Sequence, residues 1–123
     1  MPTGYKLNSL LDLWNGYDNV INNNKYANNY DFYKAVFLVN RDKFIDTGYL
    51  LLKEDNSISS PVSVLYYEYY DSKTELEAGI EKHKNSIQCV VSKSAVPFGK
   101  SQNPRLWDYA DGVDTIKFLA LLI

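Results

Sequence analysis

The stretch from Val62 to Val91, VSVLYYEYYDSKTELEAGIEKHKNSIQCVV, decides the fold that this sequence predicts. Residues 62–70 are rich in β-branched and aromatic side chains, which favour a strand. Residues 73–84 predict a helix, and the short apolar run at residues 87–91 predicts a second, buried strand. A strand, a helix and a strand within about 30 residues indicate two parallel strands joined by a right-handed crossover.

A capping box marks the start of the helix in this stretch. Ser72 and Glu75 have the required spacing, so that a hydroxyl and a carboxylate can each satisfy a backbone N–H that the first helical turn leaves unpaired. Leu76 and Ile80 lie one turn apart and are predicted to face inward.

The N-terminal part predicts one amphipathic helix over residues 6–15, followed by a loop. Apolar residues at i, i+3, i+4 and i+7 line one helical face, and Asn15-Gly16 ends the pattern. Residues 17–31 show no sustained period, and their clustered asparagines favour turns. The residues of the apolar face are Leu7, Leu10, Leu11 and Trp14.

Two further apolar runs have the length of strands. Residues 35–39 and 49–52 are continuously apolar or aromatic, as expected for strands that are covered on both faces. Residues 113–122 predict a last helix or an extended arm. With no internal repeat and no linker, the 123 residues are predicted to form a single α/β domain.

The composition excludes several classes of protein. With 46% hydrophobic and 23% charged residues, the chain is expected to fold. A net charge of −2 offers no cationic surface for phosphates, so we do not expect a nucleic-acid partner. The apolar run at residues 116–123 is too short to span a membrane. A single cysteine and the lack of a signal-peptide pattern predict a cytoplasmic protein.

Few residues suggest catalysis or metal binding. Cys89 lies in the middle of a predicted strand, which favours a small buried hydrophobe over an activated nucleophile. His83 lies near a helix C-terminus, where an imidazole interacts favourably with the helix dipole. One cysteine and one histidine cannot form a zinc site, and no phosphate-binding motif is present. No residue is therefore assigned as catalytic or as a metal ligand.

Three aspartates at i, i+3 and i+6 resemble a cation site, but we interpret them as capping and solvating a loop-to-helix junction. They are Asp108, Asp111 and Asp114.

Eleven tyrosines and the clustered asparagines are the unusual features of the composition. Residues 22–33 either stack on a flat ligand or form a rigid loop whose polar groups satisfy one another, and the second interpretation is favoured. Tyr66, Tyr67, Tyr69 and Tyr70 place phenols on both faces of one strand. Because a domain this small cannot bury all of them, a partner surface or self-association is predicted.

Three segments resemble the C-terminal third of bacterial acyl-CoA reductases, the family related to the bioluminescence fatty-acid reductase. The first is NKYANNYD at residues 24–31, and the second is GYLLLKED at 48–55 with SPVSVLYY at 60–67. The third and most specific runs from PFGKSQ at 97–102 through WDYADGVDT at 107–115. The resemblance extends from about Gly4 over nearly the whole chain.

The resemblance implies a fragment of an aldehyde-dehydrogenase-type catalytic domain, with a mostly parallel sheet and flanking helices. In such an enzyme NADPH reduces a fatty acyl-CoA to an aldehyde through a cysteine thioester. By resemblance, Glu54 would lie near the nicotinamide ribose. The candidates for the wall of the acyl channel are Asn29, Tyr30, Phe98, Gly99 and Gln102.

The chain departs from this family in two respects. The spacing from Glu54 to Pro61 is longer than in the usual motif of the superfamily. The nucleophilic cysteine and the dinucleotide-binding half have no counterpart in these residues, so the chain alone is predicted to bind no NADP(H) and to reduce no acyl-CoA. The open alternative is a free-standing module that binds a small ligand or a protein through its Asn/Tyr-rich loop.

Overall fold

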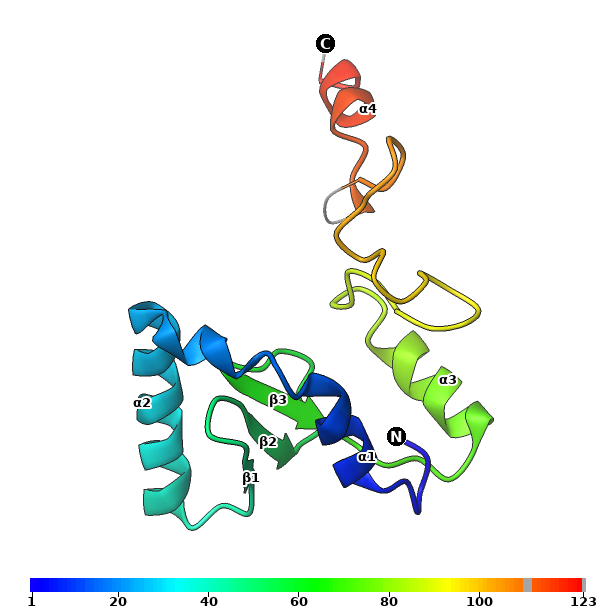
Figure 1. Ribbon diagram of the computed structural model, residues 1–123. Helices are drawn as coiled ribbons and strands as arrows, with labels where there is room; N and C mark the ends of the chain where they lie inside the picture. The colour runs from blue at the N-terminus through cyan, green and yellow to red at the C-terminus, as the bar shows by residue number, and fades with distance from the viewer. Residues whose placement is uncertain (110–111, 123) are drawn as a thin grey trace. The chain divides into compact units, whose positions relative to one another are not determined.

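The computed structural model describes residues 1–109 and 112–122 and is a mixed α/β structure with a small three-stranded sheet (Figure 1). The chain forms two compact units, Met1–Glu77 and Ala78–Ile123. The elements of the first unit are α1 (Leu7–Leu11), the 3₁₀ helices η1 (Asp12–Trp14) and η2 (Asp18–Asn22), α2 (Asn24–Asn40), β1 (Ile45–Asp46), β2 (Leu51–Glu54) and β3 (Val64–Tyr67). Helix α3 (Lys73–Lys82) crosses the division, and α4 (Thr115–Ala120) belongs to the second unit.

The sheet has the order β1-β2-β3 and is mixed, whereas a mostly parallel sheet was expected. Strand β1 pairs antiparallel with β2, and β2 pairs parallel with β3, with Leu51 opposite Val64. The strand predicted over residues 62–70 is confirmed with shorter bounds, 64–67, and the run at 49–52 is a strand that begins two residues later.

The predicted strand at residues 87–91 is wrong, and with it the strand-helix-strand unit from Val62 to Val91. Within the described part of the chain no strand follows β3, and Val91 makes only an isolated bridge with Val96. The parallel partner of β3 is β2 instead. Beyond the end of β3, the backbone of Tyr70 pairs with the N-terminal residues. The Tyr70 N–H donates to the Met1 carbonyl at 2.8 Å, and the Tyr70 carbonyl accepts from the Thr3 N–H at 2.9 Å.

Helix α2 overturns the predicted loop from Asn24 onward and the predicted strand at residues 35–39. The earlier part of the loop holds the short 3₁₀ helix η2. The Asn23 side chain caps its N-terminus by accepting from the N–H groups of Lys25 and Tyr26, at 3.0 and 3.2 Å. Arg41, in the left-handed conformation with φ 59°, ends the helix. The asparagine cluster, which predicts turns from local preferences, thus supplies the N-cap of a helix through Asn23.

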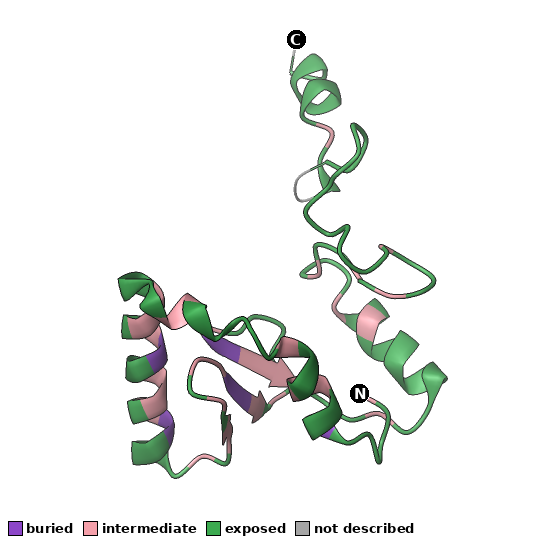
Figure 2. Cartoon of the chain, in the orientation of Figure 1, coloured by how far each residue is buried: buried purple, intermediate pink, exposed green. Residues whose placement is uncertain are grey.

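Packing of α2 against the sheet makes the core of the first unit (Figure 2). Tyr30 and Phe37, two turns apart on the helix, are buried against Leu51 and Val64 of the sheet. Leu52 is also fully buried. The inward face of α2 is thus aromatic, because Tyr33 lies half-buried beside these residues.

The other predicted helices are present, with shorter bounds. Residues 6–15 form α1 and η1, and the predicted apolar face is the protected one, with Leu7 buried. In α3, the Ser72 hydroxyl accepts from the Glu75 N–H at 3.2 Å, and the Glu75 carboxylate accepts from the N–H of Asp71 at 2.8 Å. Ile80 is half-buried, but Leu76 is 37% exposed and not inward as predicted.

The second unit contains no buried residue in its described part. Asp114 caps α4 by accepting from the N–H of Lys117 at 3.0 Å, which confirms the capping interpretation for this aspartate. Asp108 accepts from the N–H of Arg105 at 2.8 Å, and Asp111 lies outside the described residues. Among the described residues, no helix combines the length and the apolar character needed to cross a bilayer.

The core predicts the effect of substituting Leu51. Because this side chain is 0% exposed, Leu51→Ala should lower the free energy of unfolding by about 2–5 kcal/mol. Urea unfolding followed by circular dichroism measures this loss. Leu38→Ala is the matched control, since Leu38 is 60% exposed on α2, and it should change stability by less than about 0.5 kcal/mol. Equal losses in the two variants would contradict the packing described here.

Candidate functional site

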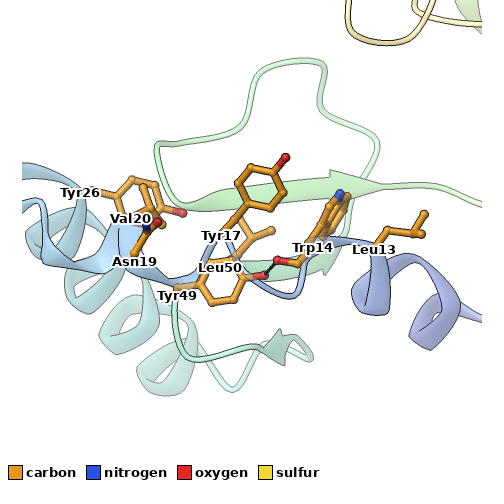
Figure 3. A pocket seen from close by; sticks show the side chains of 8 residues that line it. All are labelled: Leu13, Trp14, Tyr17, Asn19, Val20, Tyr26, Tyr49 and Leu50. Atoms are coloured by element: carbon orange, nitrogen blue, oxygen red, sulfur yellow. Dashed lines mark hydrogen bonds between the residues drawn. The ribbon is translucent and has the colours of Figure 1, made fainter.

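An aromatic hollow in the first unit is a candidate binding site (Figure 3). Its volume is about 700 Å³. No charged side chain lines it. The lining residues, here called the aromatic hollow, are Leu13, Trp14, Tyr17, Asn19, Val20, Tyr26, Tyr49 and Leu50.

Four segments bring these residues together. Gly16, at φ 104°, turns the chain between η1 and η2. The Tyr49 hydroxyl donates to the carbonyl of Trp14 at 3.0 Å, which ties the turn before β2 to η1. The Asn23 cap starts α2 and so places Tyr26 at the hollow. The sequence signal that could have revealed the hollow is the recurrence of aromatic residues beside turn-forming glycines.

The phenol of Tyr26 is electrically neutral at physiological pH. Partial burial raises its pKa above the ordinary value of 10.0, and the nearby Tyr49 raises it further. The hollow therefore presents neutral hydroxyl groups and ring surfaces.

A second cluster joins α2 to β1. The Tyr30 hydroxyl donates to the carboxylate of Asp46, and Lys34 Nζ lies 2.7 Å from Asp46 Oδ2 and 3.5 Å from the Tyr30 hydroxyl. The N–H of Gly48 donates to the same carboxylate at 2.8 Å. We call this set the Asp46 cluster.

The pKa directions in the Asp46 cluster favour a protonated phenol beside a charged carboxylate. Burial and the bond to Asp46 raise the pKa of Tyr30, although Lys34 lies one turn away. Partial burial alone would raise the pKa of Asp46, but hydrogen bonds from Lys34, Tyr30 and Gly48 outweigh it and leave the pKa lowered. The phenol thus stays protonated and the carboxylate charged.

The residues assigned by resemblance fall in both units. In the first, Asn29 is half-buried and its amide donates to the Lys25 carbonyl at 2.8 Å, while the Tyr30 ring lies in the core. Glu54 ends β2 and is exposed, paired in register with Tyr67. Asn29 and Tyr30 are consecutive residues of α2 whose side chains lie in different surroundings, the first half-buried and the second in the core.

The remaining assigned residues lie in the second unit. Phe98 is 75% exposed and Gly99 makes a turn at φ 75°. Gln102 lines a wide hollow of about 1280 Å³ that also includes Cys89 and Lys100. In the same hollow, Arg105 Nε lies 3.3 Å from Asp108 Oδ2, and the guanidinium lies 5.4 Å from the centre of the Trp107 ring.

Cys89 is exposed, so the prediction that it is a buried hydrophobe is wrong. The physical reason is the missing strand, because burial would have required residues 87–91 to join a covered sheet. No group of three acidic, histidine or cysteine side chains within the described ranges could hold a metal ion. His83 donates its N–H to the Ile80 carbonyl at 3.1 Å, just after α3 ends.

The tyrosines of the predicted partner surface are less exposed than expected. Only Tyr69, at 38%, is exposed, while Tyr66, Tyr67 and Tyr70 are half-buried. Tyr67 and Tyr69 contact each other edge to face, with ring centres 5.7 Å apart. Much of this aromatic surface is therefore covered within the first unit.

Comparison with protein-family models, curated proteins and solved structures finds no match for this chain. Its candidate function therefore depends on the residues themselves.

The Asp46 cluster predicts an acid-sensitive contribution to stability. Asp46→Asn should lower the free energy of unfolding at pH 7 by about 1 kcal/mol, because the charged acceptor of three donors is lost from a partly exposed site. Because the pKa of Asp46 is lowered in the folded chain, this contribution is complete above the ordinary value of 3.8. It disappears as the pH falls through the lower folded pKa.

Urea unfolding at neutral and at strongly acidic pH measures this effect. The difference in the free energy of unfolding between wild type and Asp46→Asn should be smaller in acid. Asp31→Asn is the control, since Asp31 is exposed on α2 and makes no ion pair with a described residue. A difference that is independent of pH would contradict the assigned role of Asp46.

The exposure of Cys89 predicts ready alkylation. In the folded chain, iodoacetamide should modify Cys89 at a rate close to that of the urea-unfolded chain, because no packing blocks the thiol. Mass spectrometry of timed samples measures both rates. Strong protection in the folded chain would restore the buried interpretation.

Proposed function

We propose that this chain acts as the C-terminal part of a cytoplasmic acyl-CoA reductase of the aldehyde-dehydrogenase superfamily. In this role it contributes the wall of an acyl channel and an assembly surface, and it has no reductase activity alone. The resemblance of residues 97–115 supports the proposal most specifically. The mixed α/β structure is compatible with a fragment of such a catalytic domain.

The observation that carries the proposal is the exposed apolar surface of the second unit. Large apolar side chains that are exposed along one stretch of chain supply the kind of surface that a partner covers. Because these residues lie within or directly after the most specific resemblance, the rest of a reductase is the partner that fits. Exposed fractions are 75% for Phe98, 95% for Leu106, 64% for Trp107, 80% for Ile116 and 78% for Leu121.

The chemistry of the proposed enzyme is divided between this chain and the rest. A cysteine elsewhere would carry the acyl group as a thioester, and bound NADPH would supply the hydride. Glu54 has an exposed carboxylate at the end of β2, which fits a hydrogen bond from a ribose hydroxyl. Phe98 and Gln102 would border the acyl chain, and the second-unit surface would hold the parts together and exclude water.

Reconstitution tests this proposal. The purified chain, mixed with a long-chain acyl-CoA and NADPH, should leave the absorbance of the reduced nicotinamide unchanged. Adding the separately produced N-terminal portion of an acyl-CoA reductase, including its nucleophilic cysteine, should restore turnover. Trp107→Ser should weaken this association about tenfold or more, as expected for a buried aromatic anchor.

Two controls make the reconstitution decisive. Lys93→Ser changes an exposed charged residue of the same unit and should leave the association unchanged. Turnover by the chain alone that Cys89→Ala abolishes would mean that this chain carries its own nucleophile. A mixture that neither associates nor turns over would overturn the proposal.

A second candidate function is a free-standing module that binds a small ligand or a protein. The Asn/Tyr-rich segment was expected to supply the contact, but its asparagines cap and line α2 and its Tyr30 is buried. The observation that favours this candidate is the aromatic hollow, to which the segment contributes Tyr26.

A further inference from the structure

The aromatic hollow has the size of a small-molecule site. Its volume of about 700 Å³ falls within the range of roughly 300–1,000 Å³ that ligand pockets occupy. Its walls come from η1, η2, the start of α2 and the turn before β2, all within the first unit (Figure 3).

The ring surfaces of the hollow are free of other rings. Elsewhere in the first unit several aromatic rings pair, as in Phe37 with Phe44 at 5.5 Å. Within the described residues, the rings that line the hollow take part in no such pair. Tyr17 is 68% exposed. The exposed Tyr17 ring and the uncovered parts of the half-buried Trp14, Tyr26 and Tyr49 rings are available to a flat ligand, which stacks on aromatic rings or meets them edge to face.

The polar groups of the hollow are neutral. The Tyr49 hydroxyl is engaged by the Trp14 carbonyl. The Tyr17 and Tyr26 hydroxyls and the Trp14 indole N–H donate to no other described residue, and Asn19 adds an amide at the rim. With no charged side chain in the lining, an ionic ligand would lose hydration without gaining a counter-charge.

We infer that the aromatic hollow binds a flat, uncharged aromatic ring that carries a hydrogen-bonding group such as an amide. An alkyl chain fits less well, because it would leave the hydroxyls and the indole N–H without partners. This inference deepens the second candidate function by naming the site and its ligand class, and it does not depend on the reductase proposal.

The test compares two probes that carry the same amide, one on a flat aromatic ring and one on a saturated ring. Benzamide has a flat ring, and cyclohexanecarboxamide carries the same amide on a puckered ring. Saturation-transfer NMR with the full chain should show binding of benzamide and a weaker signal from cyclohexanecarboxamide. Equal binding of both amides, or stronger binding of decan-1-ol than of benzamide, would overturn the inference.

Variants locate the binding. Tyr17→Leu keeps an apolar side chain but removes one ring face and one hydroxyl, and it should weaken benzamide binding about threefold to tenfold. Tyr5→Leu is the matched control, because Tyr5 is exposed and does not line the hollow, and it should bind like the wild type. Circular dichroism verifies that both variants fold.

Equal affinity of Tyr17→Leu and Tyr5→Leu for benzamide would mean that the ligand binds elsewhere and would contradict the inference. Because this readout is binding to the first unit and the reductase test reads turnover and association, the two proposals can fail separately.

Discussion

The contact between the aromatic face of α2 and the sheet is the interaction on which the first unit depends. A helix of this length is only marginally stable alone, and so is a sheet of three short strands. Burying Tyr30 and Phe37 against Leu51 and Val64 stabilises both at once. The same contact sets where the turn before β2 lies, and so it also shapes the aromatic hollow.

Charged groups fix the edges of this contact. The Asp46 cluster bonds the Tyr30 hydroxyl, which lets a phenol occupy the core without an unpaired polar group. At the other end of α2, Lys53 Nζ lies 5.0 Å from the centre of the Phe37 ring and 3.2 Å from Asp42 Oδ2. The lysine thus contacts the buried ring while its charge is paired with a carboxylate.

The two units differ in how much of their apolar side-chain surface they bury, and this difference separates the two proposals. The first unit buries its core and leaves one neutral, aromatic hollow, which suits a small ligand. The second unit buries none of its described residues although it is rich in apolar side chains. A surface of that kind suits a larger body, and the resemblance of residues 97–115 suggests which one.

The sequence by itself determined the elements whose signals are local. The capping box at Ser72, the apolar spacing after Leu7 and the β-rich run at Val64 all depend on neighbours a few residues away, so they can be read directly. Tertiary structure alone decided that β2 is the parallel partner of β3, that α2 is helical and that Cys89 is exposed. Strand pairing and burial depend on which distant segment of the chain packs against a residue. Tyrosines at helical spacing therefore form a core face only when a sheet covers them.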